Sequence, residues 1–221
     1  PNPAGFIGDP YPLDTCIVTG EKLGKDAVTL VLKDQADALQ EGRQLKFANE
    51  TAKQIFLVRE REFLTKLDTE IIHRQRASYP LDRDVVEIDR TLTEHFPFVF
   101  GNRCYVVMRS KNIDNFLKQA GRYVGTYDKM VGSKQRATYP LDTSLVSGEK
   151  LPAKPYDIVI GQRLVRLCSE AEAKTLLEDP TTYLAKLPPL KSAGDAKPSG
   201  GSVIFILRCN CQRNMVAVRR P

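Results

Sequence analysis

Cysteine and histidine side chains offer the clearest chemistry in this sequence, because thiolates and imidazoles bind zinc and copper. The 221 residues include five cysteines and two histidines. An odd number of cysteines without a double Cys-x-x-Cys pattern defines neither a disulfide framework nor a zinc site by itself. The five are Cys16, Cys104, Cys168, Cys209 and Cys211.

Enzyme chemistry is not indicated by the other polar residues. There is no Gly-x-Ser-x-Gly elbow, no His-Glu-x-x-His motif and no Rossmann glycine fingerprint. We expect His73, in the link before the second motif copy, and His95 to be solvated in loops. Asp82 and Asp84 are expected on exposed turns. The sequence therefore predicts a protein without catalytic activity.

An internal repeat organises the chain. The segment YPLDTCIVTGEKL begins at Tyr11, YPLDRDVVEIDRTL at Tyr79 and YPLDTSLVSGEKL at Tyr139, and basic segments RQRAS and KQRAT precede the last two copies. The spacing predicts modules of about 60 residues. We assign module 1 to residues 1–78, module 2 to 79–138 and module 3 to 139–187, followed by a separate segment at 188–221.

Each module contains two β-rich runs and then helix signals. Gly101-Asn102 and Gly161-Gln162 are two-residue hairpin turns, whereas a longer loop joins the runs of module 1. Ser169 with Glu172 has capping-box spacing, and Asp179-Pro180 ends one helix and begins the next. The fold class is therefore α+β: three tandem small modules, each a β-hairpin plus one or two short helices, with a C-terminal extended arm. The expected strands are 28–32, 45–48, 96–100, 103–109, 156–160 and 163–168.

The motif, the Leu167-Cys168 pair at the hairpin end and the closing DPTTYLAKL from Asp179 resemble the small bacterial metal-binding modules called TRASH or YHS-like domains. Module 3 is the most similar copy, module 1 is partial and module 2 is remote. The resemblance implies a treble-clef or zinc-ribbon-like fold. It also implies a metal held by a cysteine of the motif and further cysteines at the hairpin end and in the first helical turn.

Most of the implied ligands are replaced in this chain. A structural zinc site needs four Cys or His ligands, and no module keeps more than one thiol, so we expect no cofactor and a structural or protein-interaction role. The alternative is a zinc- or copper-binding metal-handling protein that uses Cys16, Cys168, Cys209 and Cys211. The implied ligand positions are Cys16, Ala48, Asn49 and Ala52 in module 1, Asp84, Met108, Arg109 and Asn112 in module 2, and Ser144, Cys168, Ser169 and Glu172 in module 3.

Positive charge is concentrated after the repeats. Residues 188–221 hold six basic side chains and one acidic side chain, so they carry +5 of the net +6. The near-neutral body lacks the basic face of a nucleic-acid-binding domain, so we expect no specific nucleic acid.

An apolar, β-forming run at 202–207 favours strand pairing. We expect this arm to bind other protein subunits or a second copy. Pairing with the chain's own modules and contact with an acidic membrane surface are alternatives. The arm residues singled out are Val203, Phe205, Leu207, Arg208, Arg219 and Arg220.

Location is inferred only indirectly. The sequence begins with proline, which suggests a trimmed N-terminus, and the resembling family occurs in secreted bacterial proteins. These two points predict an extracytoplasmic protein, periplasmic or secreted. No apolar run approaches the ~18 residues that span a bilayer, so no transmembrane segment is expected.

Overall fold

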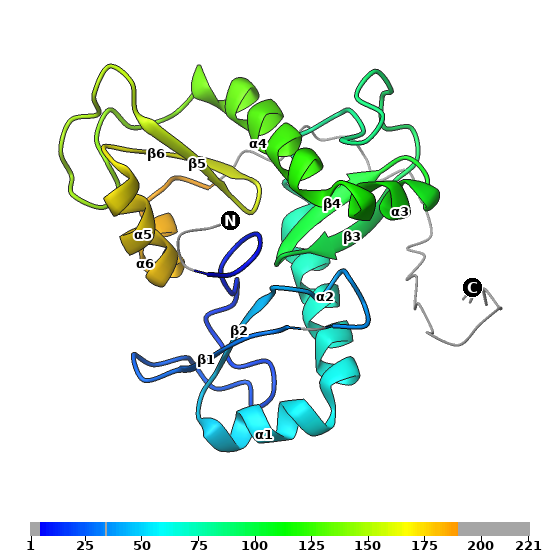
Figure 1. The fold of residues 1–221 in the computed structure, drawn as a ribbon. Coiled ribbons are helices and arrows are strands. Elements are labelled where there is room, and N and C mark those ends of the chain that lie inside the picture. The colour runs from blue at the N-terminus through cyan, green and yellow to red at the C-terminus, as the bar shows by residue number, and fades with distance from the viewer. Residues whose placement is uncertain (1–4, 34, 190–221) are drawn as a thin grey trace.

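A computed structural model describes residues 5–33 and 35–189. These residues form six helices and three separate two-stranded antiparallel sheets (Figure 1). The predicted α+β class, built from small repeated hairpin-and-helix units, is therefore confirmed. The expected C-terminal arm lies outside the described residues. No described helix is long and apolar enough to cross a membrane.

The three hairpins match the predicted β-rich runs, with small differences at their ends. The predicted strand ends at Arg109 and Cys168 are wrong by one or two residues, because the N–H groups of Met108 and Cys168 bond to carboxylates instead of a facing strand. The long loop of module 1 is present between its two strands. The strands are β1 (Val28–Val31), β2 (Gln44–Phe47), β3 (Phe96–Phe100), β4 (Arg103–Val107), β5 (Tyr156–Ile160) and β6 (Arg163–Leu167).

A short helix follows each hairpin, and side-chain caps precede α1, α5 and α6. Asn49 and Ser169 accept hydrogen bonds from the N–H groups three residues later, and Asp179 does the same before Pro180. The caps predicted at Ser169 and Asp179 are thus confirmed. The short helices are α1 (Glu50–Val58), α3 (Lys111–Lys118), α5 (Glu170–Glu178) and α6 (Pro180–Leu184).

Two long helices correct the expectation of short ones. α2 (Glu60–Arg76) and α4 (Ala120–Arg136) have 17 residues each and include most of the segments taken as basic links. Those segments hold good helix formers, and the prolines that restrict the backbone come only at Pro80 and Pro140. His73 accordingly lies on α2, exposed, and not in a loop.

Each long helix packs on the hairpin of the module that follows it in the sequence. α2 packs on β3 and β4, and α4 packs on β5 and β6. In Figure 1 the three hairpins and their helices surround a centre into which the dark-blue N-terminal segment runs. The long helices therefore connect neighbouring modules both in sequence and in the core.

Candidate functional site

Equivalent turns surround the motif position of modules 1 and 3. The N–H of Cys16 bonds to the carbonyl of Glu21, and the N–H of Gly20 bonds back to Cys16; Ser144 makes the same pair with Glu149 and Gly148. Gly20 and Gly148 both have φ near +75°, a conformation that glycine adopts without strain. We call the space around Cys16, Asp84 and Ser144 the motif pocket of modules 1, 2 and 3.

In module 2 the motif pocket is filled by a buried carboxylate. Asp84 is 0% exposed, and its Oδ1 accepts hydrogen bonds from the N–H groups of Val86 and Glu87. Its Oδ2 accepts from the N–H of Met108 at 2.7 Å and from Nδ2 of Asn112 at 2.9 Å. The expectation of an exposed Asp84 was wrong, because four donors replace the water that this carboxylate would otherwise need.

In module 3 the carboxylate comes from the helix. Oε2 of Glu172 accepts hydrogen bonds from Oγ of Ser144 at 2.6 Å and from the N–H of Cys168 at 2.7 Å. Burial opposes the charge of Glu172, but the bond with Ser144 and those from its neighbours outweigh burial and lower its pKa. Glu172 thus acts as the anionic group of this pocket.

In module 1 the group in the pocket is the thiol of Cys16, which is 1% exposed. Burial would raise its pKa, but hydrogen bonds from the backbone of Thr19, Ala48 and Val18 outweigh it and lower the pKa. Val18, Thr19 and Ala48 correspond in the repeat to Val86, Glu87 and Met108. The same set of N–H donors therefore faces a carboxylate in module 2 and a thiol in module 1.

The motif pocket of module 2 does not fit a metal ion. The oxygens of Asp84 already face four N–H groups, whose positive ends would repel a cation. In module 1 the side-chain oxygen of Asn49 caps α1 by accepting a hydrogen bond from the N–H of Ala52. The methyl side chain of Ala52 has no atom that could bind a metal. Among the described residues, no group of three or more His, Cys, Asp or Glu side chains is arranged to hold a metal.

The predicted cysteine ligands are separated by the fold. Cys16 and Cys168 each lie in the motif pocket of their own module, and Cys209 and Cys211 fall outside the described residues, as do all six arm residues. Burial and the nearby Glu172 carboxylate raise the pKa of the Cys168 thiol.

A second cluster of polar residues joins the three modules at the centre of the molecule. The Asp9 carboxylate accepts two hydrogen bonds from the Arg103 guanidinium, at 2.6 and 2.9 Å, and one from the N–H of Gly161. The N–H of Asp9 also bonds to the carbonyl of Gly101. Both charged side chains of this pair are at most 5% exposed. One N-terminal residue thus contacts the hairpin turns of modules 2 and 3.

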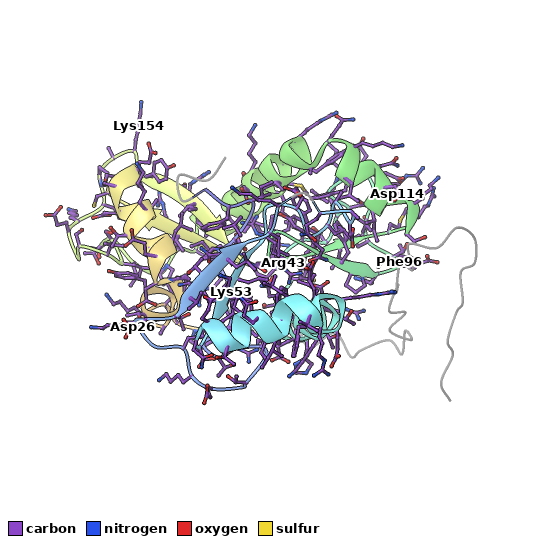
Figure 2. The ribbon with its side chains drawn as sticks, turned by 60° about the horizontal axis from the view of Figure 1, so that its bottom comes forward. Asp26, Arg43, Lys53, Phe96, Asp114 and Lys154 are labelled. Carbon is purple, nitrogen blue, oxygen red and sulfur yellow. The ribbon has the colours of Figure 1, made fainter. Side chains whose placement is uncertain are left out.

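The turn of module 1 enters the same cluster through Arg43, which lies in the interior in Figure 2. Its guanidinium donates to Asp68 on α2 at 2.6 Å and to Oδ1 of Asn102 at 2.7 Å. Nδ2 of Asn102 donates to the Gln44 carbonyl at 2.8 Å. Modules 1 and 2 are therefore joined by a charged side chain whose partners come from both.

Glutamine side chains make the remaining links of this central cluster. Gln75 at the end of α2 accepts from the N–H of Cys104, and Gln135 at the end of α4 accepts from the N–H of Leu164. Gln162 donates to the Cys104 carbonyl at 2.9 Å and accepts from the hydroxyl of Tyr127. Sequence reasoning missed this cluster. A usable signal was present, because Arg43, Arg103 and Arg163, like Gln75 and Gln135, are spaced by 60 residues.

No protein-family model matches this chain, and neither a curated protein nor a solved structure matches it significantly. The class that the structure defines is therefore an α+β protein of small repeated hairpin-and-helix units, described by its own geometry.

Proposed function

We propose that this protein is a non-enzymatic structural or protein-interaction subunit, built from modules that descend from TRASH or YHS-like metal-binding domains. The observation that carries the proposal is the state of the motif pockets. In modules 2 and 3 the side chains at the implied ligand positions hydrogen bond to each other and to the backbone. Internal polar contacts take over the stabilising role that a metal has in such small modules.

The central cluster supports a rigid body and not a set of independent metal carriers. Asp9 and Arg103 form a buried, doubly hydrogen-bonded ion pair between the N-terminal segment and module 2, and Gly161 of module 3 bonds to the same carboxylate. Removing one partner of such a pair typically costs about 3–5 kcal/mol. Modules fixed in this way present a single surface to a partner.

The proposed role includes an extracytoplasmic assembly in which the C-terminal arm contacts other subunits or a second copy. The experiment compares the molecular mass in solution of the full chain with that of a variant carrying Val203→Asp, Phe205→Asp and Leu207→Asp. We expect an assembled wild type and a monomeric variant. A control with Ser192→Asp, Ala193→Asp and Ala196→Asp adds the same charge to the same segment and is expected to stay assembled. A wild type that is monomeric at all concentrations contradicts the arm's role.

A metal-handling function is the second candidate, and one observation favours it. The backbone donors around Cys16 lower the pKa of its thiol, and thiolates are the cysteine form that binds zinc and copper. Elemental analysis of the purified full chain after dialysis distinguishes the two functions. Stoichiometric zinc or copper supports metal handling and contradicts the scaffold proposal.

A further inference from the structure

Three arginines occupy the same place in the three modules, but only two of them have a carboxylate partner among residues 5–33 and 35–189. Arg43 pairs with Asp68 and Arg103 with Asp128, in each case 25 residues later on the long helix of the same module. Both guanidinium groups are at most 3% exposed. These two ion pairs serve as a template for module 3: they predict that the third arginine, Arg163, should also contact a carboxylate.

Arg163 of module 3 departs from that template. The residue 25 positions later is Pro188, and Arg163 donates to its backbone carbonyl. Arg163 forms no ion pair with any of the residues 5–33 and 35–189. It is only half-buried, and burial without a counter-charge lowers the pKa of its guanidinium. Module 3 therefore has the cation of the repeated pair without the anion.

The reason lies in where the helix ends. α2 and α4 continue for 17 residues and carry Asp68 and Asp128 in their middle turns. The counterpart in module 3, α6, ends at Leu184, and Pro188-Pro189 disfavours helical backbone immediately afterwards. The helical turn that bears the carboxylate in modules 1 and 2 thus has no counterpart in residues 180–189.

A small pocket lies beside Arg163. Its volume is about 80 Å³, which is room for a few water molecules or one carboxylate group. The apolar and polar groups around it suit a side chain with an aliphatic stem and a charged end. It is lined by Gln135, Thr138, Tyr139, Pro140, Arg163, Leu164 and Leu187.

We propose that this pocket docks an aspartate or glutamate in the first turn of a helix of a partner protein, and that this helix takes the place of the later turns of the long helices, which α6 does not reach. The chain's own sequence does not supply this acid, since Pro188 stands at the position of Asp68 and Asp128. The proposal rests on the proposed protein-interaction function.

The test measures binding of an N-acetylated, helix-stapled peptide with the sequence of residues 128–136 to the full chain by calorimetry. We expect Asp128→Asn in the peptide, or Arg163→Gln in the protein, to weaken binding at least tenfold, as for a charge-assisted pair. Lys154→Gln removes an equal charge from an outward-pointing residue (Figure 2) and is expected to leave affinity unchanged. Thermal melts of both protein variants show whether each is folded.

Three results would overturn the proposal. The first is equal affinity of the peptide for wild type and a folded Arg163→Gln variant, and the second is no binding at millimolar peptide. The third is a tenfold gain in affinity on Asp195→Asn, which would mean that the chain's own acidic residue occupies the pocket. None of these changes the mass of the assembly measured with the arm variants, so failure here is distinguishable from failure of the proposed function.

Discussion

The motif pockets of modules 1 and 2 differ in the group they hold more than in the backbone that holds it. In module 2 the N–H groups of Val86, Glu87 and Met108 bond to the Asp84 carboxylate. In module 1 the equivalent backbone faces the thiol of Cys16 and lowers its pKa against the effect of burial. The backbone of this pocket therefore favours the anionic form of the side chain that it faces.

Module 3 extends the comparison, because its anion comes from a different position in the sequence. Ser144 replaces the motif cysteine and is neutral, and Glu172 on α5 supplies the charge from four residues after Cys168. Modules 2 and 3 thus place a carboxylate in the motif pocket by two routes. The common requirement is that buried N–H groups at the end of the hairpin have an acceptor.

The largest expected effect comes from removing the anion of module 2. Asp84→Ala leaves the N–H groups of Val86, Glu87 and Met108 and the amide of Asn112 without their acceptor. Each unsatisfied buried donor costs about 1–3 kcal/mol, so we expect the free energy of unfolding to fall by more than ~3 kcal/mol in urea denaturation. Asp82→Ala is the control, since its side chain is 76% exposed, and should cost less than ~0.5 kcal/mol. A loss below 1 kcal/mol for Asp84→Ala would show that the pocket does not depend on its anion.

A second prediction is that the motif pocket of module 3 binds zinc when cysteines are placed at its implied ligand positions. The triple variant Ser144→Cys, Ser169→Cys and Glu172→Cys has four thiols together with Cys168. We expect it to bind zinc, and at free zinc 100-fold above the dissociation constant the stabilisation should be about 2.7 kcal/mol. Melting temperatures with and without zinc, together with elemental analysis, measure both effects.

The same triple variant with Cys168→Ser is the matched control and should bind zinc more weakly. Equal zinc affinity of the three-thiol and four-thiol chains, or no zinc in either, would be evidence against ancestry from a metal-binding module.

A smaller effect is expected from Glu172→Gln, which removes the charge but keeps the size of the side chain. The cost should be about 1–2 kcal/mol, because two hydrogen bonds lose their charged acceptor. The lowered pKa of Glu172 means that its contribution is present above the ordinary glutamate pKa and lost as pH falls through the folded pKa. Urea denaturation across the acidic range should therefore show a flatter pH dependence for the variant.

Glu170→Gln is the control for this prediction, because Glu170 is an exposed residue in the first turn of the same helix. It should leave the acid dependence close to that of the wild type. An unchanged acid dependence in Glu172→Gln would contradict the assigned role of Glu172.

The hairpins and caps were predictable because their signals are local. Gly101 and Asn102 have positive φ as a two-residue hairpin turn requires, and Ser169 and Asp179 cap helices as their types predict. The long helices were missed because basic residues around Arg76 and Arg136 were taken as links, although nothing in those segments breaks a helix. Local reasoning also placed Asp84 on an exposed turn, since its donors come from residues up to 28 positions away.

The central cluster required the fold, because it joins residues far apart in sequence. Asp9 bonds to Arg103 and Gly161, and the latter is 152 residues away. A repeat alignment finds the equivalent arginines, but only packing shows that Arg43 and Arg103 are buried in ion pairs, whereas Arg163 is half-buried and pairs with no carboxylate of the described residues. The residues that hold the modules together could therefore be suspected from their spacing but not assigned.

The smallest expected effect, Cys16→Ser, is the most specific for the difference between modules 1 and 2. A serine hydroxyl fits the pocket but does not ionise, so at neutral pH the cost should be about 1 kcal/mol. Because the folded-state pKa of Cys16 is lowered, wild-type stability should rise with pH between that pKa and the unfolded thiol value of about 8.5. The variant should lack this rise when urea denaturation is followed from about pH 6 to about pH 9.

Cys104→Ser is the control for this last difference, because burial raises the pKa of Cys104 to about 12, so its thiol stays neutral over the same interval. That variant should lose stability by an amount that does not vary with pH below about 9. If Cys16→Ser and Cys104→Ser show the same pH dependence, the donors around Cys16 do not stabilise a thiolate. The pocket of module 1 would then hold a neutral side chain, in contrast to the carboxylate of module 2.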